Sequence, residues 1–213
     1  TNRLFRDTNA WYHLQFVIDT SESTATDRFK IYVNGELETS YSTQTFGASS
    51  GFNLLSASGT NYFTVGAAEN GTGAFNGCMS HVHFCDGTAL APTVFGSTDS
   101  TTGEWKINTS PSFTPGNNGF TILKDGNTIT DQSSNSNDFT LGAGTLTKTE
   151  DCPSNVFATL NPLGYAASAN YTLANGNTAK TVTGTTNAWR TAYGTMGASS
   201  GKYYWEIKIT GDE

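Results

Sequence analysis

The N-terminal part of the chain alternates apolar and polar residues with the period of a β-strand. One such run covers residues 11–18, and a second covers residues 28–33. The apolar members of the first run fall on one face of a predicted half-buried strand: Tyr12, Leu14, Phe16 and Ile18. The second run ends at Asn34-Gly35, a dipeptide typical of tight hairpins because type I′ turns need positive φ at both positions. The pattern predicts a hairpin with its return strand over residues 36–42.

Further short strands are predicted along the rest of the chain. In the run over residues 75–86, Ser80, Val82 and Phe84 alternate with His81 and His83, which places the two kinds of side chain on opposite faces. Residues 90–95 predict one short helical turn. The other predicted strands cover residues 61–66, 117–124, 171–173, 179–183, 189–193 and 202–209. Because no long helical period is present, the pattern indicates an all-β protein.

Composition agrees with this fold class and excludes several others. Only 14% of the 213 residues are charged, while 12% are aromatic and 23 are glycine. Disordered chains usually carry high charge and few aromatics, and no apolar run approaches the roughly 20 residues of a membrane span. The net charge of −7 argues against a nucleic-acid partner. We therefore expect neither nucleic-acid binding nor membrane insertion.

The cysteines give a weak indication of environment. Cys78, Cys85 and Cys152 are odd in number, so they cannot all pair within the chain. Cys78 and Cys85 lie seven residues apart on one predicted strand, too far apart to be bridged. We expect three free, buried thiols, which suits assembly in a reducing cytoplasm.

Several motifs in the first hundred residues resemble a known family. They are Trp11-Tyr12-His13, Asp19-Thr20, the segment from Arg28 to Gly35, and the segment from Phe75 to Gly87 followed by Leu90. In this order they resemble a concanavalin A-like lectin domain of the laminin-G type, as found in bacteriophage structural proteins. The resemblance implies a jelly-roll β-sandwich over residues 1–95. His81 stands where the resemblance leads us to expect Glu.

The rest of the chain resembles the continuation seen in phage tail proteins. Residues 96–151 are rich in turn residues and are expected to form a connector that packs on its neighbours. Residues 152–213 resemble the start of a second β-sandwich, because the segment from Ser200 to Ile207 is similar to the opening strand of an SPRY domain. We expect these residues to be a window cut from a longer protein, with an incomplete sandwich at each end whose strand edges other segments must cover.

The resemblance implies a non-enzymatic virion protein, located in a phage tail fibre or appendage, whose lectin-like modules contact host surface glycans. Its partners would be other virion subunits, in a homo-oligomer, with affinity for glycans arising from multivalency. Two alternatives stay open: a purely structural or decoration protein of the particle, and a glycan-cleaving tail spike.

The sequence gives little support to catalysis. Glycoside hydrolysis needs two carboxyl groups about 5 to 9 Å apart, and no run of the type Glu-x-Asp-x-x-Glu is present. Gly-x-Ser-x-Gly occurs at residues 47–51 and 197–201, but a nucleophile elbow requires a strand-to-helix turn, and no helix is predicted after either copy. Both copies are therefore expected to be turns.

Two groups of residues could bind a metal. His81 and His83 share a strand face, but only His13 remains as a third imidazole, so a surface or interface pair is expected. The polar segment from residue 131 to residue 138 could offer oxygen ligands to calcium, although turn-capping by the same side chains explains it equally well. The calcium candidates are Asp131, Asn135, Asn137 and Asp138. No cofactor is expected, with calcium as the one alternative.

The four tryptophans are candidates for stacking on sugar rings. Trp11 and Trp205 lie in alternating strands and are expected in the core. Trp105 lies in a stretch rich in turn residues, so we predict it as the carbohydrate-binding aromatic on the surface.

Overall fold

The computed structural model describes residues 1–6, 10–43, 63–68, 72–124, 126, 128–163, 171–183 and 190–211. They divide into two compact units, residues 1–157 and residues 158–213. The regular elements of the described residues are short antiparallel strands and two single-turn 3-10 helices, which confirms the predicted all-β class. None of these helices has the length and hydrophobicity that crossing a membrane requires.

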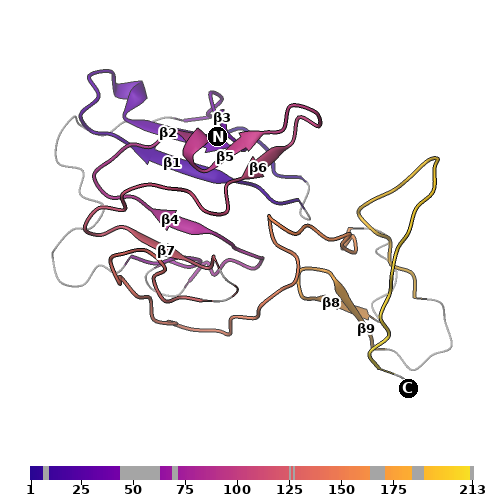
Figure 1. The fold of residues 1–213 in the computed structure, drawn as a ribbon. Helices are drawn as coiled ribbons and strands as arrows, with labels where there is room; N and C mark the ends of the chain where they lie inside the picture. The colour runs from indigo at the N-terminus through magenta and orange to yellow at the C-terminus, as the bar shows by residue number, and fades with distance from the viewer. Residues whose placement is uncertain are drawn as a thin grey trace. The chain divides into compact units, whose positions relative to one another are not determined.

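The predicted N-terminal hairpin forms the largest sheet of the first unit (Figure 1). Strand β1 (Leu14–Ile18) pairs antiparallel with β2 (Phe29–Val33), and β2 pairs with β3 (Glu36–Leu37). The turn at Asn34 and Gly35 has φ of 50° and 78°, as a type I′ hairpin requires. A 3-10 turn, η1 (Ala25–Asp27), precedes β2. The return strand is much shorter than predicted.

The buried face of β1 is the opposite of the one expected from its pattern. Leu14, Phe16 and Ile18 are 46%, 60% and 40% exposed, whereas Gln15 and Val17 between them are half-buried. Gln15 donates from Nε2 to the backbone carbonyl of Leu90, 2.8 Å away. Neighbouring segments thus pack on the face that carries Gln15. Strand alternation specifies two faces, but the rest of the fold decides which one is covered.

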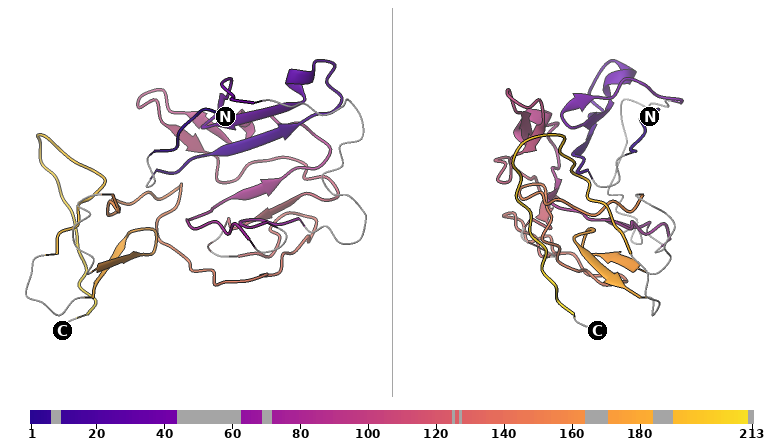
Figure 2. Two further views of the ribbon diagram at one scale, coloured as in Figure 1. Left: turned by 180° about the vertical axis from the view of Figure 1, so that it is seen from behind. Right: turned by 90° about the vertical axis from the view of Figure 1, so that its right-hand side faces the viewer.

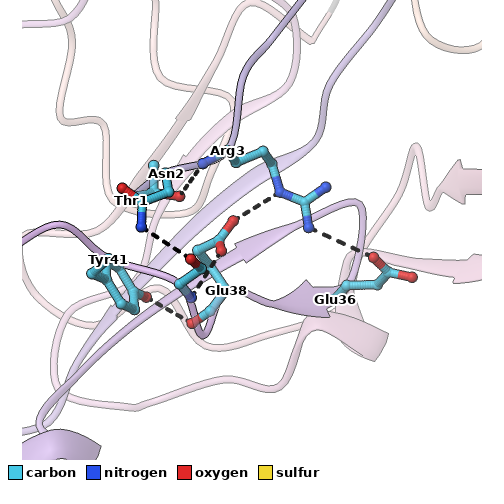
Figure 3. Close-up of polar contacts among 7 residues, drawn as sticks. Thr1, Asn2, Arg3, Glu36, Glu38 and Tyr41 are labelled. Atoms are coloured by element: carbon cyan, nitrogen blue, oxygen red, sulfur yellow. Dashed lines mark hydrogen bonds and ion pairs between the residues drawn. The ribbon is translucent and has the colours of Figure 1, made fainter.

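The N-terminal residues are held beside β3 by a polar network (Figure 3). The guanidinium of Arg3 donates from Nε to Glu38 Oε2 at 2.8 Å and lies 3.8 Å from a carboxylate oxygen of Glu36. Glu38 is only 7% exposed, and its other oxygen accepts the backbone N–H of Ser40. The backbone N–H of Asn2 donates to the carbonyl of Ser40, which extends the sheet by one contact.

Strands β4 (Val82–Phe84) and β7 (Phe120–Ile122) form a second pair with aromatic packing on both faces. On one face the cross-strand partners Phe84 and Phe120 stack at 5.6 Å between ring centroids, and Phe63 and Phe139 pack against them. This cluster and the buried Ile122 form the hydrophobic core of the pair. On the other face His83 lies opposite Thr121.

The segment expected to be a connector contributes strands to the first unit. Strand β7 lies within it, and β5 (Gly96–Thr98) pairs with β6 (Trp105–Ile107) in a hairpin that the sequence pattern did not predict. The side chain of Asp99 accepts from the backbone N–H groups of Thr101 and Thr102 and pairs with Lys106 at 2.7 Å. The right-hand view of Figure 2 shows this hairpin beside the β1–β2–β3 sheet.

Other predicted elements of the first unit differ from the structure. The helical turn expected over residues 90–95 is confirmed as η2 (Pro92–Val94). The long strand expected over residues 75–86 is confirmed only over β4, because His81 has a φ of 51°, which breaks the extended backbone. Residues 63–66 of the strand predicted over 61–66 are not extended in a sheet, and the other two lie outside the described residues.

The described residues of the second unit contain one regular hairpin. Strand β8 (Tyr171–Ala174) pairs with β9 (Ala179–Val182), as predicted, and a single bridge joins Leu160 to Gly194. The described part of the strand predicted over 189–193 is not a strand.

Residues 202–211 are assigned to no strand and form no pairing with any described strand. Trp205 is 75% exposed, so the expectation that it lies in the core is wrong. Its strand alternates as predicted, but burial also needs a neighbouring sheet, and none of the described residues supplies one.

Candidate functional site

A hollow of about 170 Å³ opens on the His83 face of the β4–β7 pair. Its floor comes from the two strands, and its walls come from the loops before and after β7. The wall residues combine an aromatic ring and two prolines with hydroxyl and amide groups. The hollow is lined by His83, Pro111, Phe113, Pro115, Thr121, Lys124, Gln132, Ser133 and Ser134.

The floor of the hollow is held rigid by hydrogen bonds and ring contacts. His83 Nδ1 lies 2.9 Å from Thr121 Oγ1, its cross-strand neighbour. The His83 ring stacks on Phe95 at 5.7 Å, and Phe113 meets both rings edge-on. The pKa of His83 is lowered to about 4, mainly by burial and to a smaller extent by the nearby groups His81 and Lys124. The floor is therefore uncharged at neutral pH.

The loop that carried the calcium candidates forms one wall of the hollow. The carboxylate of Asp131, only 9% exposed, accepts the backbone N–H groups of Thr121, Ser133 and Asn137 and the hydroxyl of Ser133, all at 2.8 to 2.9 Å. Burial by itself would raise the pKa of Asp131, but these hydrogen bonds outweigh it and hold the pKa below its ordinary value.

The other calcium candidates are also occupied in holding the loop. Asp138 accepts the backbone N–H of Asp131. Asn137 donates from Nδ2 to the carbonyls of Asn117 and Gly119, and Asn135 donates from the same atom to the carbonyls of Gly116 and Gly119. The structure brings all four residues together, but their polar atoms serve backbone groups. This arrangement favours the turn-capping alternative, and calcium binding stays a prediction.

Trp105 lies outside the hollow. It is half-buried, its indole stacks on the imidazole of His13 at 5.7 Å between ring centroids, and it packs over the backbone of Gly35 and Gly96. Trp105 Nε1 and His13 Nδ1 are buried and have no hydrogen-bond partner among the described residues. Stacking on His13 occupies one face of the indole. The role of Trp105 in binding a sugar stays a prediction, and Phe113 is the aromatic ring that lines a hollow.

The histidines do not gather into a metal site. His81 and His83 lie with ring centroids 6.4 Å apart, but the Nδ1 atom of each is engaged, with Ser80 for His81 and with Thr121 for His83. Among the residues that the structure describes, no group of three or more His, Cys, Asp or Glu side chains is placed to hold an ion. The three cysteines are free, as predicted, but half-buried.

One pair of carboxylates was not found from the sequence. Glu36 and Glu38, two residues apart, both face the guanidinium of Arg3 (Figure 3). The hydrogen bond from Arg3 lowers the pKa of Glu38. A glycosidase acid needs the opposite shift, because it must hold its proton near neutral pH. The pair therefore neutralises an arginine and is unsuited to acid catalysis.

Only the second Gly-x-Ser-x-Gly motif lies in the described part of the chain, and it does not line the hollow. Residues 197–201 form an exposed bend followed by extended chain, in line with the predicted turn. Residues 47–51 lie outside the described residues.

Comparison with known families bears on the N-terminal part of the chain. Residues 1–95 match the family model of the concanavalin A-like lectin/glucanases superfamily. The match indicates a concanavalin A-like β-sandwich fold for this part of the chain. The matched segment contains β1 to β4, and the match supports a lectin-like or carbohydrate-binding module. Because the superfamily includes both lectins and glucanases, it does not decide between binding and cleavage.

Comparison with curated proteins and with solved structures gave no match. The resemblance of residues 200–207 to an SPRY strand and the phage setting therefore stay predictions.

Sequence reasoning found the loop of residues 131–138 but missed the hollow beside it. Thr121 and Lys124 lie in the strand predicted over residues 117–124, but nothing in the sequence relates that strand to Phe113 or to His83. They come together only because β7 pairs with β4, a partner 38 residues earlier in the register His83–Thr121.

Proposed function

We propose that this chain is a non-enzymatic, lectin-like module of a phage virion, part of a tail fibre or appendage, which binds host surface glycans. The observation that carries the binding role is the hollow beside β7 in a chain whose first 95 residues match a lectin superfamily. Sugar sites commonly join an apolar surface to a few well-placed polar groups, and Phe113 with Thr121 and Gln132 supplies such a set. The virion setting rests on the order of the motifs in the sequence.

Two observations support binding without cleavage. None of the residues that line the hollow is Asp or Glu, so it lacks the two carboxyl groups that hydrolysis of a glycosidic bond requires. Elsewhere in the described residues, the carboxylates of Glu36 and Glu38 lie close together, but both form ion pairs with Arg3. A binding site with a hydrogen-bonded floor and no acid suits reversible contact with a glycan.

Assembly into a homo-oligomer is supported by the exposed segment of residues 202–211, for which the sequence predicts a strand. In the predicted strand Tyr203, Trp205, Ile207 and Ile209 fall on one face, and all four are 69% to 83% exposed. Two copies that pair antiparallel about Ile207 would place Glu206 opposite Lys208 twice and Trp205 opposite Ile209. Opposite charges and large apolar residues in register favour such a pairing over random association.

The glycan role is tested by a glycan array probed with the oligomeric protein and with two variants. Ser134→Trp inserts a large ring at an exposed position of the hollow without removing packing, and Ser100→Trp adds the same ring at an exposed turn elsewhere. We expect the wild type and the Ser100→Trp variant to bind the same glycans and the Ser134→Trp variant to lose them.

An array on which the wild-type protein binds nothing would remove the adhesion role and leave the structural or decoration alternative. Release of free sugar from a bound glycan, measured by chromatography, would instead favour a glycan-cleaving spike.

A further inference from the structure

Lys124 is the one group in the lining of the hollow that suits an acidic ligand. It follows β7 directly, is half-buried, and is the only lining residue with a full charge at neutral pH, since His83 is neutral there. Its backbone N–H donates to Gln132 Oε1 at 3.1 Å, which fixes the start of its side chain at the wall of the hollow.

The ammonium group of Lys124 has no carboxylate partner among the described residues. The ammonium groups of Lys30 and Lys106 lie within 4 Å of carboxylates, whereas that of Lys124 forms no ion pair with any described residue. Asp131, which does not line the hollow but precedes its lining residues Gln132 and Ser133, directs its oxygens to three backbone N–H groups and one hydroxyl. In a chain of net charge −7, a half-buried cation without a carboxylate is unusual.

The size of the hollow limits what it can hold. Its volume of about 170 Å³ is well below the ~300 Å³ at which pockets for drug-sized ligands begin. One sugar ring is therefore a better fit than an oligosaccharide. Pro111, Phe113 and Pro115 offer apolar surface to the ring, and Thr121 and Ser133 offer oxygen atoms already positioned by bonds to His83 and Asp131.

We propose that the hollow recognises a single sugar unit that carries a negative charge, with Lys124 pairing with its carboxylate or sulfate group. The inference rests on the proposed glycan-binding function and names the class of sugar that it selects. A charge-assisted bond in a half-buried wall is stronger than a neutral one, so charge should govern selectivity between sugars of the same ring. The neutral walls bind the ring itself.

The test compares methyl β-glucuronide, a methyl glucoside 6-sulfate and methyl β-glucoside by titration into the whole labelled protein, followed by NMR. We expect the two charged glycosides to shift the amide signals of Thr121 and Gln132 and to bind at least about tenfold more tightly than the neutral one. Binding of only one charged glycoside identifies whether carboxylate or sulfate is preferred. Lys124→Gln should remove this preference and leave binding of the neutral glycoside unchanged.

Lys148→Gln serves as the control, because it removes the same charge at an exposed position that neither lines the hollow nor lies in residues 202–211. Equal affinity for charged and neutral glycosides, or an unchanged preference in Lys124→Gln, would overturn the inference while the proposed function stands. A glycan array on which only neutral glycans are bound would overturn it in the same way. If neither the array nor the titrations detect any binding, the proposed function itself fails.

Discussion

The indole of Trp105 lies flat against the imidazole of His13, with ring planes 13° apart and centroids 5.7 Å apart. The contact joins the β5–β6 hairpin to His13, the residue directly before β1. The indole also covers the glycine of the type I′ turn between β2 and β3. Packing of one aromatic ring thus connects three segments that the sequence does not visibly relate.

Replacing Gly35 with alanine should displace that ring. A Cβ atom at this position would lie 2.2 Å from Trp105 Cζ3, and the backbone φ of 78° already disfavours a side chain. Overpacking costs about 1–3 kcal/mol, and the left-handed conformation adds about 1 kcal/mol. We expect Gly35→Ala to lower the free energy of unfolding by about 3 kcal/mol in urea titrations.

Gly103→Ala is the matched control for this substitution. Gly103 has a φ of 74°, but a Cβ there would meet no atom within 4 Å. Only the backbone cost of about 1 kcal/mol should appear. Equal losses in the two variants would mean that Trp105 does not pack on Gly35 in solution.

Stability should fall as the pH drops from about 6.5 to about 4. The pKa of His83 is lowered by burial to about 4, while the unfolded chain titrates near 6.5. Between these values the unfolded state binds the extra proton, so the free energy of unfolding decreases by at most about 1.4 kcal/mol per pH unit for this group. Burial lowers the pKa of His13 as well and adds to the same trend.

His83→Gln isolates the contribution of that histidine. Glutamine keeps a polar group near Thr121 but does not titrate, so its urea midpoint should fall less between pH 7 and pH 4.5 than that of the wild type. The carboxylates with lowered pKa, such as Glu38 and Asp99, contribute at more acidic pH because they stay ionised across this window. Identical pH profiles would exclude His83 as the cause.

Asp131→Ala should destabilise the first unit far more than Asp138→Ala. The first change leaves three backbone N–H groups without an acceptor, including that of the buried Thr121 in β7, whereas the second removes one bond at an exposed side chain. We expect losses of about 3 kcal/mol and about 1 kcal/mol respectively, measured by urea unfolding. Similar losses would show that the Asp131 network is not formed.

Calcium should not raise the melting temperature. Because the oxygens of Asp131 already accept four donors, a cation would have to displace hydrogen bonds that hold the loop. We expect equal melting temperatures in 5 mM calcium and in excess chelator. A rise with calcium of several degrees, lost in Asp131→Asn, would instead establish the calcium alternative.

Ile207→Lys should weaken self-association if residues 202–211 pair with a second copy. The change places like charges at the centre of the proposed antiparallel register, where each Ile207 faces its counterpart. Light scattering coupled to size-exclusion chromatography should show a shift toward monomer. Lys180→Gln, in β9, provides a control in the same unit. An unchanged mass for Ile207→Lys would exclude this pairing.

Local patterns were sufficient for the elements whose signals lie within a few residues. The Asn34-Gly35 turn, the β8–β9 hairpin and the 3-10 turn at Pro92–Val94 were all predicted. The β5–β6 hairpin was missed because its strands have three residues each, too short for an alternating pattern to appear. The loop at Asp131 was recognised as a cluster of oxygen atoms, but its partners lie in β7 and could not be named.

The sequence by itself determined that this protein is all-β, where its first hairpin turns, and that its early residues resemble a lectin-like sandwich. Tertiary structure decided which face of β1 is covered. The alternating pattern places Leu14 on one face and Gln15 on the other, and the contact of Gln15 with Leu90 shows that the Gln15 face is the covered one. Tertiary structure also created the hollow, because pairing of β7 with β4 brings Lys124 and Phe113 to the face of His83. Strand periodicity is a local property, whereas burial and binding sites depend on contacts between residues far apart in the chain.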